Sequence, residues 1–489
     1  MPYDDLREFI GVLEKKKLLV RVTYPVNSKL EITEILNRLL AREGPAVLFE
    51  RVKGSRIPVL ANLYGTLERV AMGLDSDEAG LTEIGSFLAF LQRPEPPKGF
   101  IDAVKHLPFY SRILHLSPKR VSRAPCQEIV LTGDEIDLDL IPILHCWPQD
   151  VGPQITWPLV ITRSPEEGEK YNIGIYRMQK LDKKRTIMRW LKHRGGAQHW
   201  RQWMAVNKVM PVAVALGCEP GITIAAVTPV PESLGEFHFA GLLRKKPVDL
   251  VPCKTIDLLV PATSEIIIEG EIHPGEMADE GPHGDHTGFY NSVEPFPIFK
   301  ITCITHRADP IYLTTTTGRP PREDAVIGLA LNTVFLPLLR QHFSEIVDFH
   351  LPMEACSYRI AVVSIKKEYP GHAKRVMMGI WGFLKQFLYI KYIIVVDQDI
   401  HIRKWEDVVW AISTQVDPAR DTFVIEHTPI DYLDFASPQS GLGSKMGIDA
   451  TTKIHPETDR EWGVRITMDP QVVARIDKLW EALGIGSLL

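Results

Sequence analysis

The segment 280–288, Glu-Gly-Pro-His-Gly-Asp-His-Thr-Gly, places two carboxylates and two imidazoles close together in the chain. Glycine and proline favour a sharp turn of fixed shape, so Glu280 and Asp285 would be held at set positions. Two carboxylates in different environments can perform acid–base chemistry, one staying charged while the other delivers a proton. The alternative is a surface turn whose Asp and His side chains cap backbone groups. The loop by itself does not decide between the two interpretations.

A second candidate lies upstream, in the alternating segment 172–177. A strand period of two places Asn172, Gly174 and Tyr176 on one face and Arg177 on the other. Arginine is permanently charged and pairs with carboxylates in a fork geometry, so Arg177 is a candidate partner for the acidic loop. An ordinary surface arginine on a strand is the alternative.

Cations alternate with tryptophans in the segment that follows, a pattern typical of sites for phosphate or nucleic acid. Gly195 and Gly196 would let backbone amides approach an anion at the start of a helix. The chain has a net charge of −5, so a small phosphorylated ligand is favoured over a polynucleotide. A solvated helix face is the alternative. The residues concerned are Arg185, Arg189, Trp190, Lys192, His193, Arg194, Trp200, Arg201 and Trp203.

Two weaker signals complete the set. The segment 441–447 is rich in glycine and contains Lys445, so we interpret it as a loop whose lysine could reach an anion. It matches neither the dinucleotide fingerprint nor the P-loop pattern. Glu236 follows the turn 229–231, where a glutamate is usually exposed.

The whole chain sets broader bounds. Its 489 residues exceed one typical core and predict two or three domains. The six cysteines are scattered without a CxxC pair, which argues against a zinc site and favours reduced thiols in the cytoplasm. We expect no signal peptide and no transmembrane segment, because no uncharged apolar run is long enough to span a bilayer. Contact with the surface of the inner membrane is left open.

The elements that would position these residues fall into four parts. Residues 1–120 predict a small α/β domain with helices at 4–13 and 31–42 and strands at 18–22, 46–49 and 58–60, ending in a proline-rich linker at 92–97. Residues 121–321 carry short strands at 128–131, 159–162, 172–178, 211–216, 265–271 and 299–306, which predict an antiparallel barrel or sandwich, and one helix at 194–207. Residues 322–345 form a linker helix.

The fourth part, 346–489, alternates strand and helix. Strands at 359–365, 392–397 and 422–426 with helices at 372–388 and 405–414 predict a parallel sheet covered by helices. Asp469 and Pro470 begin a last helix with an apolar stripe of Val473, Ile476, Trp480 and Leu483. Such a stripe docks on its own domain or on a neighbouring subunit.

Taken together and in this order, the segments resemble the UbiD family of decarboxylases over essentially the whole length. The resemblance is closest to bacterial 4-hydroxy-3-polyprenylbenzoate decarboxylases of ubiquinone biosynthesis. It rests on the stretches 172–177, 189–196, 236–243, 280–288, 317–321, 372–378, 431–437 and 441–451.

The resemblance implies a lyase that removes CO2 from 4-hydroxy-3-polyprenylbenzoate to leave 2-polyprenylphenol. It also implies a split β-barrel that binds prenylated FMN, a divalent metal, usually manganese, near the cofactor's phosphate, and often a potassium ion. By their match to the family, Asn172, Glu236 and His193 would surround the metal. The flavin would contact Ile175, Tyr176, Arg177, Arg189, Trp190, Leu191, Arg194 and Gly195, with Lys445 over the phosphate.

The family's catalytic set corresponds to Arg177, Glu280 and Asp285, and Asp at the last position matches the ubiquinone branch. The resemblance implies a covalent adduct between substrate and flavin, loss of CO2, and protonation by Asp285. A carboxyl that donates must be protonated, so we expect an apolar pocket to raise the pKa of Asp285. Glu280 and Arg177 would form an ion pair.

The resemblance further implies a flavin prenyltransferase as cofactor supplier and a homohexamer assembled through the C-terminal domains. Three alternatives stay open. The first is another aromatic-acid decarboxylase or carboxylase of the same family. The second is a metal-dependent hydrolase that uses His283, Asp285 and His286 as ligands. The third is a binding or assembly protein whose C-terminal domain and last helix form an oligomer surface.

Overall fold

The N-terminal part of the chain folds as predicted. The computed structural model describes residues 3–92, 115–166, 171–192, 194–228, 235–356, 358–383, 385–480 and 482–483. Helix α1 (Leu6–Lys15) begins where Asp5 accepts hydrogen bonds from the amides of Arg7 and Glu8, and it buries Leu6, Phe9, Ile10 and Leu13. Strands β1 (Leu19–Val22), β2 (Ala46–Phe49) and β3 (Val59–Ala61) form a sheet with α2 (Glu31–Leu40) between the first two strands in the chain.

This first sheet is completed by a strand from a distant part of the sequence. Strand β16 (Tyr312–Leu313) pairs in parallel with β3, which ties the first part of the chain to the end of the central part. Helices α3 (Leu67–Gly73) and α4 (Glu78–Gln92) follow β3. The predicted linker lies beyond α4, at residues that, except for Gln92, are outside those described.

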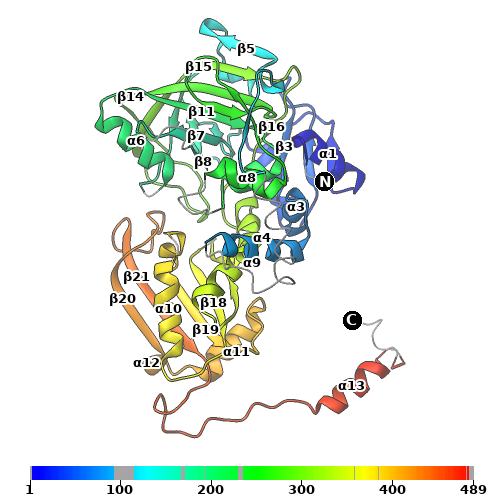
Figure 1. Ribbon diagram of the computed structural model, residues 1–489, viewed down its shortest axis with the longest axis vertical. Helices are drawn as coiled ribbons and strands as arrows, with labels where there is room; N and C mark the ends of the chain where they lie inside the picture. Colours follow the sequence, from blue (N-terminus) through cyan, green and yellow to red (C-terminus); the bar gives the residue numbers. More distant parts are fainter. Residues whose placement is uncertain are drawn as a thin grey trace, which may run out of the picture.

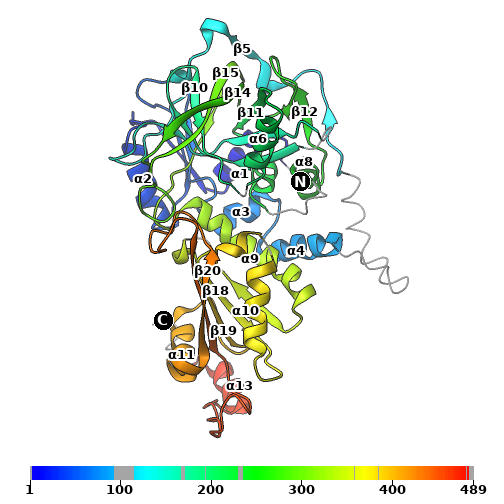
Figure 2. The ribbon, with the colours of Figure 1, turned by 90° about the vertical axis from the view of Figure 1, so that its left-hand side faces the viewer.

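The central part is one curled antiparallel sheet, which confirms the predicted β-barrel class (Figures 1 and 2). The strand order is β6-β9-β10-β15-β14-β11-β7-β8, with β5 paired to β15. These strands are β5 (Ile129–Thr132), β6 (Gln154–Ile155), β7 (Leu159–Arg163), β8 (Tyr171–Ile175), β9 (Met178–Lys180), β10 (Arg185–Met188), β11 (Met210–Leu216), β14 (Ile266–Glu280) and β15 (Glu294–His306). A smaller sheet holds β13 (Leu259–Pro261), β12 (Asp249–Pro252) and β4 (Lys119–Arg120).

Two of the strand boundaries that differ from the prediction affect the site. The predicted strand 172–178 is interrupted, because β8 ends at Ile175 and β9 begins at Met178. Arg177 therefore lies in a connection, where the expected alternation no longer applies. Strand β14 instead continues beyond 271 as far as Glu280, so the first carboxylate of the acidic loop is carried by a long strand.

A buried helix joins the curled sheet to the C-terminal domain. Helix α9 (Glu323–His342) confirms the predicted linker helix and buries apolar residues along its length. It leads to a sheet of order β17-β18-β19-β21-β20 covered by α10 (His372–Phe383) and α11 (Trp405–Gln415) (Figure 1). The strands are β17 (Ile346–His350), β18 (Ile360–Ile365), β19 (Tyr392–Asp397), β20 (Thr422–Pro429) and β21 (Leu442–Ala450).

The predicted parallel pairing is confirmed for β18 and β19, but the predicted third strand is wrong in direction. Strand β20 runs antiparallel to β21 at the edge of the sheet. The glycine-rich segment is itself the third parallel strand, so its interpretation as a loop is wrong. Glycine is unfavourable in strands, which hid the strand in the sequence. A Cβ on Gly447 would lie 2.4 Å from the Phe423 ring and 2.5 Å from the sulfur of Met377, so packing requires glycine there.

The last helix stands apart from the body of the chain. Helix α13 (Pro470–Leu479) begins after Asp469, whose carboxylate accepts hydrogen bonds from the amides of Gln471 and Val472. None of its residues is buried, and Val473 and Trp480 are 44% and 40% exposed. Figure 1 shows it at the end of a segment that leads away from the C-terminal sheet. The stripe therefore does not dock on its own domain.

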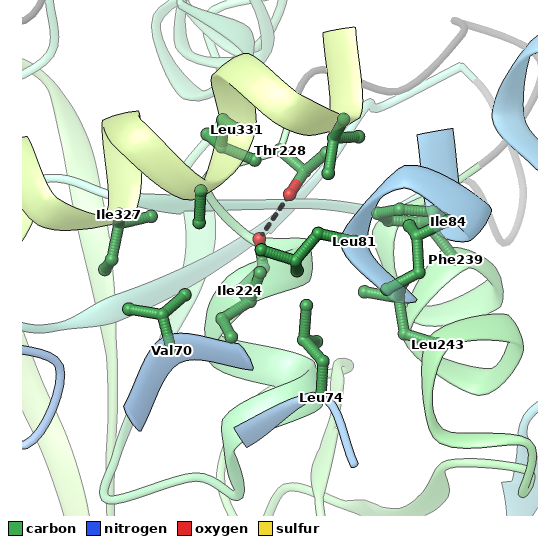
Figure 3. A pocket seen from close by; sticks show the side chains of 12 residues that line it. Val70, Leu74, Leu81, Ile84, Ile224, Thr228, Phe239, Leu243, Ile327 and Leu331 are labelled. Atoms are coloured by element: carbon green, nitrogen blue, oxygen red, sulfur yellow. Dashed lines mark hydrogen bonds between the residues drawn. The ribbon is translucent and has the colours of Figure 1, made fainter. Parts of the chain in front are cut away.

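A small apolar pocket lies at the meeting point of several helices rather than at the acidic loop (Figure 3). Its walls come from α3, α4 and α9 together with α7 (Pro220–Ala225) and α8 (Glu236–Arg244). The hydroxyl of Thr228 donates to the carbonyl of Ile224 at 2.8 Å within the wall. The side chains of Phe239 and Leu243 pack here, so this core fixes the back of the helix that begins with Glu236.

No helix in the described parts of the chain combines the length and apolar character that crossing a bilayer requires.

Candidate active site

Glu280 lies between two guanidinium groups in the interior. It ends β14 with no exposed surface. Arg177 donates from Nε to Oε1 of Glu280 at 2.9 Å, and Arg189 at the end of β10 forms an ion pair with Oε2. The amide of Asn291 donates to the same Oε2 at 3.1 Å. Burial raises the pKa of Glu280, but the two arginines outweigh it and hold that pKa below its ordinary value.

Asp285 completes the cluster from the other side of Arg177. Its Oδ2 pairs with Nη1 of Arg177, and its Oδ1 accepts hydrogen bonds from the backbone amide of His286 at 2.8 Å and from its Nδ1 at 2.9 Å. Burial raises the pKa of Asp285, yet Arg177 and His286 together hold it well below 3.8. The expected rise in this pKa is therefore wrong for the arrangement seen here, in which Asp285 is a carboxylate.

The part of the acidic loop that carries the two carboxylates, 280–285, is largely buried and hydrogen-bonded, so its interpretation as a surface turn is wrong. His283 is fully buried and Asp285 is 6% exposed. The side-chain oxygen of Gln179 accepts from the Gly281 amide at 2.8 Å, and His283 Nε2 lies 3.0 Å from the same oxygen. The carboxylate of Asp150 accepts from the amide of Gly284 at 2.9 Å. The loop is thus held by β9 and by the segment before β6.

His286 connects this loop to the C-terminal domain, a contact that the sequence did not predict. Its Nε2 lies 3.4 Å from Oδ2 of Asp431, which Arg359 holds with a contact of 3.1 Å. Burial lowers the pKa of His286, but Asp285 and Asp431 outweigh it and raise that pKa to about 10. The ring is therefore an imidazolium between two carboxylates.

The C-terminal domain makes two further contacts here. The hydroxyl of Tyr432 accepts from Nε and Nη2 of Arg189 at 3.2 and 2.6 Å. The rings of Phe289 and Phe435 meet edge to face with centroids 6.1 Å apart. Sequence analysis recognised the stretch 431–437 but assigned no role to its side chains, because nothing local shows that they reach a loop so distant in the chain.

The start of α6 (Gly195–Ala205) forms a cradle around the second group of predicted residues. The buried hydroxyl of Tyr176 accepts from the amide of Gly196 at 3.1 Å. A Cβ on Gly195 would lie 1.9 Å from Oδ1 of Asn172, and one on Gly196 would lie 2.6 Å from Nε1 of Trp190. That indole nitrogen is buried and has no hydrogen-bond partner among the residues that the structure describes. The close backbone, the unpaired donor and the helix start fit an anion such as a flavin phosphate.

Two oxygen ligands predicted for a metal approach this cradle. Asn172 lies on β8, and its Nδ2 is 3.4 Å from the hydroxyl of Tyr176. The pKa of the same tyrosine is raised, chiefly by burial, although hydrogen bonds from Gly196 and Asn172 lower it. Glu236 at the start of α8 adds to the rise, which shows that its carboxylate is near enough to act on the tyrosine. Amide and carboxylate oxygens suit manganese. His193 lies outside the described residues, so the predicted ligand set stays a prediction.

The positions of three other predicted cofactor residues neither support nor contradict a contact with the flavin. Ile175 ends β8, and Leu191 follows β10, both half-buried. Lys445 is buried on β21 and donates to the carbonyl of Ile390 at 3.0 Å and to that of Leu388. Burial lowers its pKa to about 8. A contact between Lys445 and a phosphate stays a prediction.

The histidines of the loop do not form a metal centre. His283, Asp285 and His286 are all described, but His283 bonds to Gln179 while His286 bridges two carboxylates. Among the described residues, no group of three His, Cys, Asp or Glu side chains could hold a metal ion. The hydrolase alternative therefore has no site in this part of the chain.

Family models match three successive parts of the chain. They describe the N-terminal, Rift-related and C-terminal domains of UbiD, 3-octaprenyl-4-hydroxybenzoate carboxy-lyase, and match residues 10–88, 119–320 and 325–450.

Solved structures agree over nearly the whole chain. Vanillic acid decarboxylase of Sedimentibacter hydroxybenzoicus in its closed form is similar at 31% identity and a TM-score of 0.84, covering 99% of both chains. The UbiD-class enzyme HmfF of Pelotomaculum thermopropionicum in complex with FMN is similar at 30% identity and a TM-score of 0.80, covering 96% of this chain and 98% of that one. An evolved dimeric form of HmfF, in complex with prFMN, is similar at 29% identity and a TM-score of 0.78, with the same coverage.

Proposed function

Because the chain belongs to the UbiD family of carboxy-lyases, we propose that it removes CO2 from 4-hydroxy-3-polyprenylbenzoate, without oxidation, to leave 2-polyprenylphenol. The observation that carries this proposal is the buried cluster of Arg177, Glu280 and Asp285. It provides a fixed positive charge and an acid–base pair at the position that the family resemblance makes catalytic. The step belongs to ubiquinone biosynthesis.

Two features support a substrate with an apolar tail. Phe289 and Phe435 are 64% and 52% exposed and form their aromatic pair directly beyond Asp285 and Asp431. Val293 on the same loop is 53% exposed. Exposed apolar side chains gathered beside a buried polar site are typical of an entry for an apolar ligand. A related aromatic acid without a tail is the alternative substrate.

The residues of the chain supply charge and a proton. Removing CO2 from an aromatic acid needs an electron sink that side chains lack, and prenylated FMN supplies that sink when it is bound. Arg177, held between Glu280 and Asp285, would orient the substrate's carboxylate. Once CO2 has left, Asp285 would transfer a proton to the ring carbon. Its pKa must rise for this step, which follows if Arg177 turns part of its charge toward the bound ligands.

The cradle at α6 would hold the cofactor. The amide of Gly195 and the guanidinium of Arg194 would bind the phosphate, while Trp190 would donate from Nε1, which has no partner among the described residues. Asn172 and Glu236 would hold a Mn2+ ion, and a K+ ion would also be bound; these ions would supply positive charge that offsets the negative charge of the phosphate. A flavin prenyltransferase would supply the cofactor.

The proposal extends to assembly and location. The exposed stripe of α13 supports a homohexamer that forms through C-terminal domains, since an apolar helix face is stable only when covered. A polyprenyl tail partitions into lipid, so the enzyme would meet its substrate at the surface of the inner membrane.

The proposed reaction is tested with protein co-expressed with a flavin prenyltransferase. The absorption spectrum and the mass of the released ligand identify the cofactor. The holoenzyme is then given 4-hydroxy-3-polyprenylbenzoates of increasing tail length, vanillate and 3,4-dihydroxybenzoate, and the phenols are separated by liquid chromatography. We expect kcat/KM to rise with tail length. Preference for vanillate or 3,4-dihydroxybenzoate would replace the proposed substrate with the alternative.

Asp285→Asn tests the proton donor. An amide cannot donate the proton, so we expect product formation to fall by at least about 100-fold, the usual contribution of a general acid, with the flavin spectrum unchanged. Asp279→Asn, an exposed carboxylate on β14, is the matched control and should keep full activity. Turnover near the wild-type rate in Asp285→Asn would remove Asp285 from the mechanism.

A further inference from the structure

His286 is the titratable group that touches the proposed donor but has no role in the reaction described above. Its Nδ1 is 2.9 Å from Oδ1 of Asp285, and its Nε2 is 3.4 Å from Oδ2 of Asp431. The first carboxylate belongs to the acidic loop and the second to the C-terminal domain. Its side chain is 26% exposed, so the ring is the part of the cluster that reaches solvent.

We propose that His286 is the proton reservoir that supplies Asp285 with its proton in each turnover, with Asp431 as the positioning residue that sets the ring. The inference rests on the proposed function, because it presumes that Asp285 gives its proton to the product. It adds a residue from a different domain to the set that resemblance assigns.

The geometry determines which ring nitrogen of His286 can pass a proton to Asp285. Asp431 lies at Nε2 and is itself held by Arg359, so the proton on Nε2 stays in place and Nδ1 is turned toward Asp285. The same logic fixes the tautomer of a catalytic histidine in hydrolases. The backbone amide of His286 also donates to Oδ1 of Asp285, which fixes that carboxylate relative to the residue that carries the ring.

The protons balance in this scheme. Decarboxylation of a carboxylate takes up one proton for each product released. With the ligands bound, the N–H bond at Nδ1 of His286 breaks and an O–H bond forms on Asp285, which leaves the ring neutral. That O–H bond then breaks as the new C–H bond forms, so Asp285 is again a carboxylate. Water returns a proton to Nδ1 once the product has gone.

The charges around the His286 ring favour its protonated form at the start of a turnover. Asp285 and Asp431 contact it, and Asp324 at the start of α9 is close enough to interact with it electrostatically. Arg177 is paired with Asp285, and Arg359 is paired with Asp431. The two contacting carboxylates raise the pKa of His286 to about 10, so the ring is protonated at neutral pH.

The test separates proton delivery from the loss of CO2. Holoenzyme is given 4-hydroxy-3-prenylbenzoate as the probe, and two rates are measured between pH 6 and 9. One is release of the phenol. The other is exchange of 13C-labelled bicarbonate into the substrate's carboxyl group, which needs C–C cleavage but no proton from Asp285.

His286→Gln keeps polar atoms beside Asp285 but cannot carry the proton. We expect phenol release to fall about tenfold or more at pH 8, with a loss that grows as the pH rises, while carboxyl exchange stays near the wild-type rate. Asp431→Asn should show a smaller loss of the same form. His273→Gln, a partly exposed histidine on β14, is the matched control and should change neither rate.

Two results would overturn the proposal. Phenol release unchanged in His286→Gln would show that the ring is dispensable, and a parallel loss of both rates would show a purely structural role.

Nitrogen NMR of histidine-labelled protein gives a reading that needs no substrate. The resonance lost in His286→Gln should show a charged ring through pH 8, and titration near pH 6.5 would contradict the relay. Wild-type protein that releases no phenol would instead count against the proposed function.

Discussion

At the scale of single residues, the site is defined by charge balance more than by any one group. Glu280 is shared by Arg177 and Arg189, and Asp285 is shared by Arg177 and His286. Sequence analysis could predict which residues belong together, because their types and their resemblance to a family identify them. It could not predict that Asp285 is ionised, since that depends on the positions of two cations outside its own pattern.

Glu280→Gln tests this balance through stability. Removing one partner of a buried ion pair costs on the order of 3–5 kcal/mol, because the two guanidinium groups then lack a counter-charge. The folded pKa of Glu280 is lowered, so its contribution is present above its unfolded pKa of about 4.3 and is lost as pH falls through the folded value. We therefore expect a lower free energy of unfolding at pH 7 and a flatter loss of stability below about pH 4.

Urea unfolding of the cofactor-free protein at several pH values measures this effect. The matched control is Glu426→Gln, which changes an exposed glutamate and should leave the curve within about 0.5 kcal/mol. A variant as stable as wild type at pH 7 would show that the carboxylate of Glu280 is not needed to balance the positive charge of the two arginines.

At the scale of elements, two strand ends and one helix start assemble the site. Strand β14 delivers Glu280 to the loop, and the break between β8 and β9 turns Arg177 toward it. Amphipathic helices such as α1 were predictable from apolar periodicity alone. Strand β21 was not, because its Gly447 is required by the neighbours Phe423 and Met377, which pack against it from other elements.

Gly195→Ala tests the cradle at α6. The new Cβ would meet Oδ1 of Asn172 at 1.9 Å, so the amide must move and the anion site is distorted. We expect affinity for FMN to fall at least about tenfold, the loss of about 1.4 kcal/mol of binding free energy, as measured by fluorescence titration. Gly328→Ala on α9 has open space around it and should bind FMN normally. Normal binding by Gly195→Ala would remove the cradle from the cofactor site.

Glu236→Ala tests the metal bridge at the start of α8. If manganese joins the phosphate to Asn172 and Glu236, losing one carboxylate ligand should release metal and flavin together. Metal analysis and the flavin absorbance of purified protein give the two readings, with Glu83→Ala, an exposed glutamate on α4, as the control. Full flavin content without metal would contradict a phosphate held through the ion.

At the scale of the whole molecule, the site is divided between two domains. The curled sheet supplies Arg177, Glu280 and Asp285, and the C-terminal domain supplies Asp431 and Tyr432. Helix α9 connects the two, and the contacts across the junction include polar ones at the proton-transfer residues and the apolar ring pair of Phe289 and Phe435. Family resemblance predicted both domains, but only their three-dimensional arrangement shows that the second one contacts the proton-transfer residues.

Helix α13 carries the last prediction, because its exposure is a property of the isolated chain. A helix of ten residues is marginally stable in water, and this one exposes Val473 and Trp480 without a partner among the described residues of its own chain. A neighbouring subunit that covers the stripe would stabilise the helix and bury its apolar side chains. Replacing Val473 and Trp480 with Glu places charges in that interface, so we expect the oligomer to dissociate toward the monomer mass of 55.2 kDa in light scattering. Lys478→Glu on the same helix should leave the mass unchanged. An assembly of unaltered mass in the double variant would show that the subunits associate through another surface.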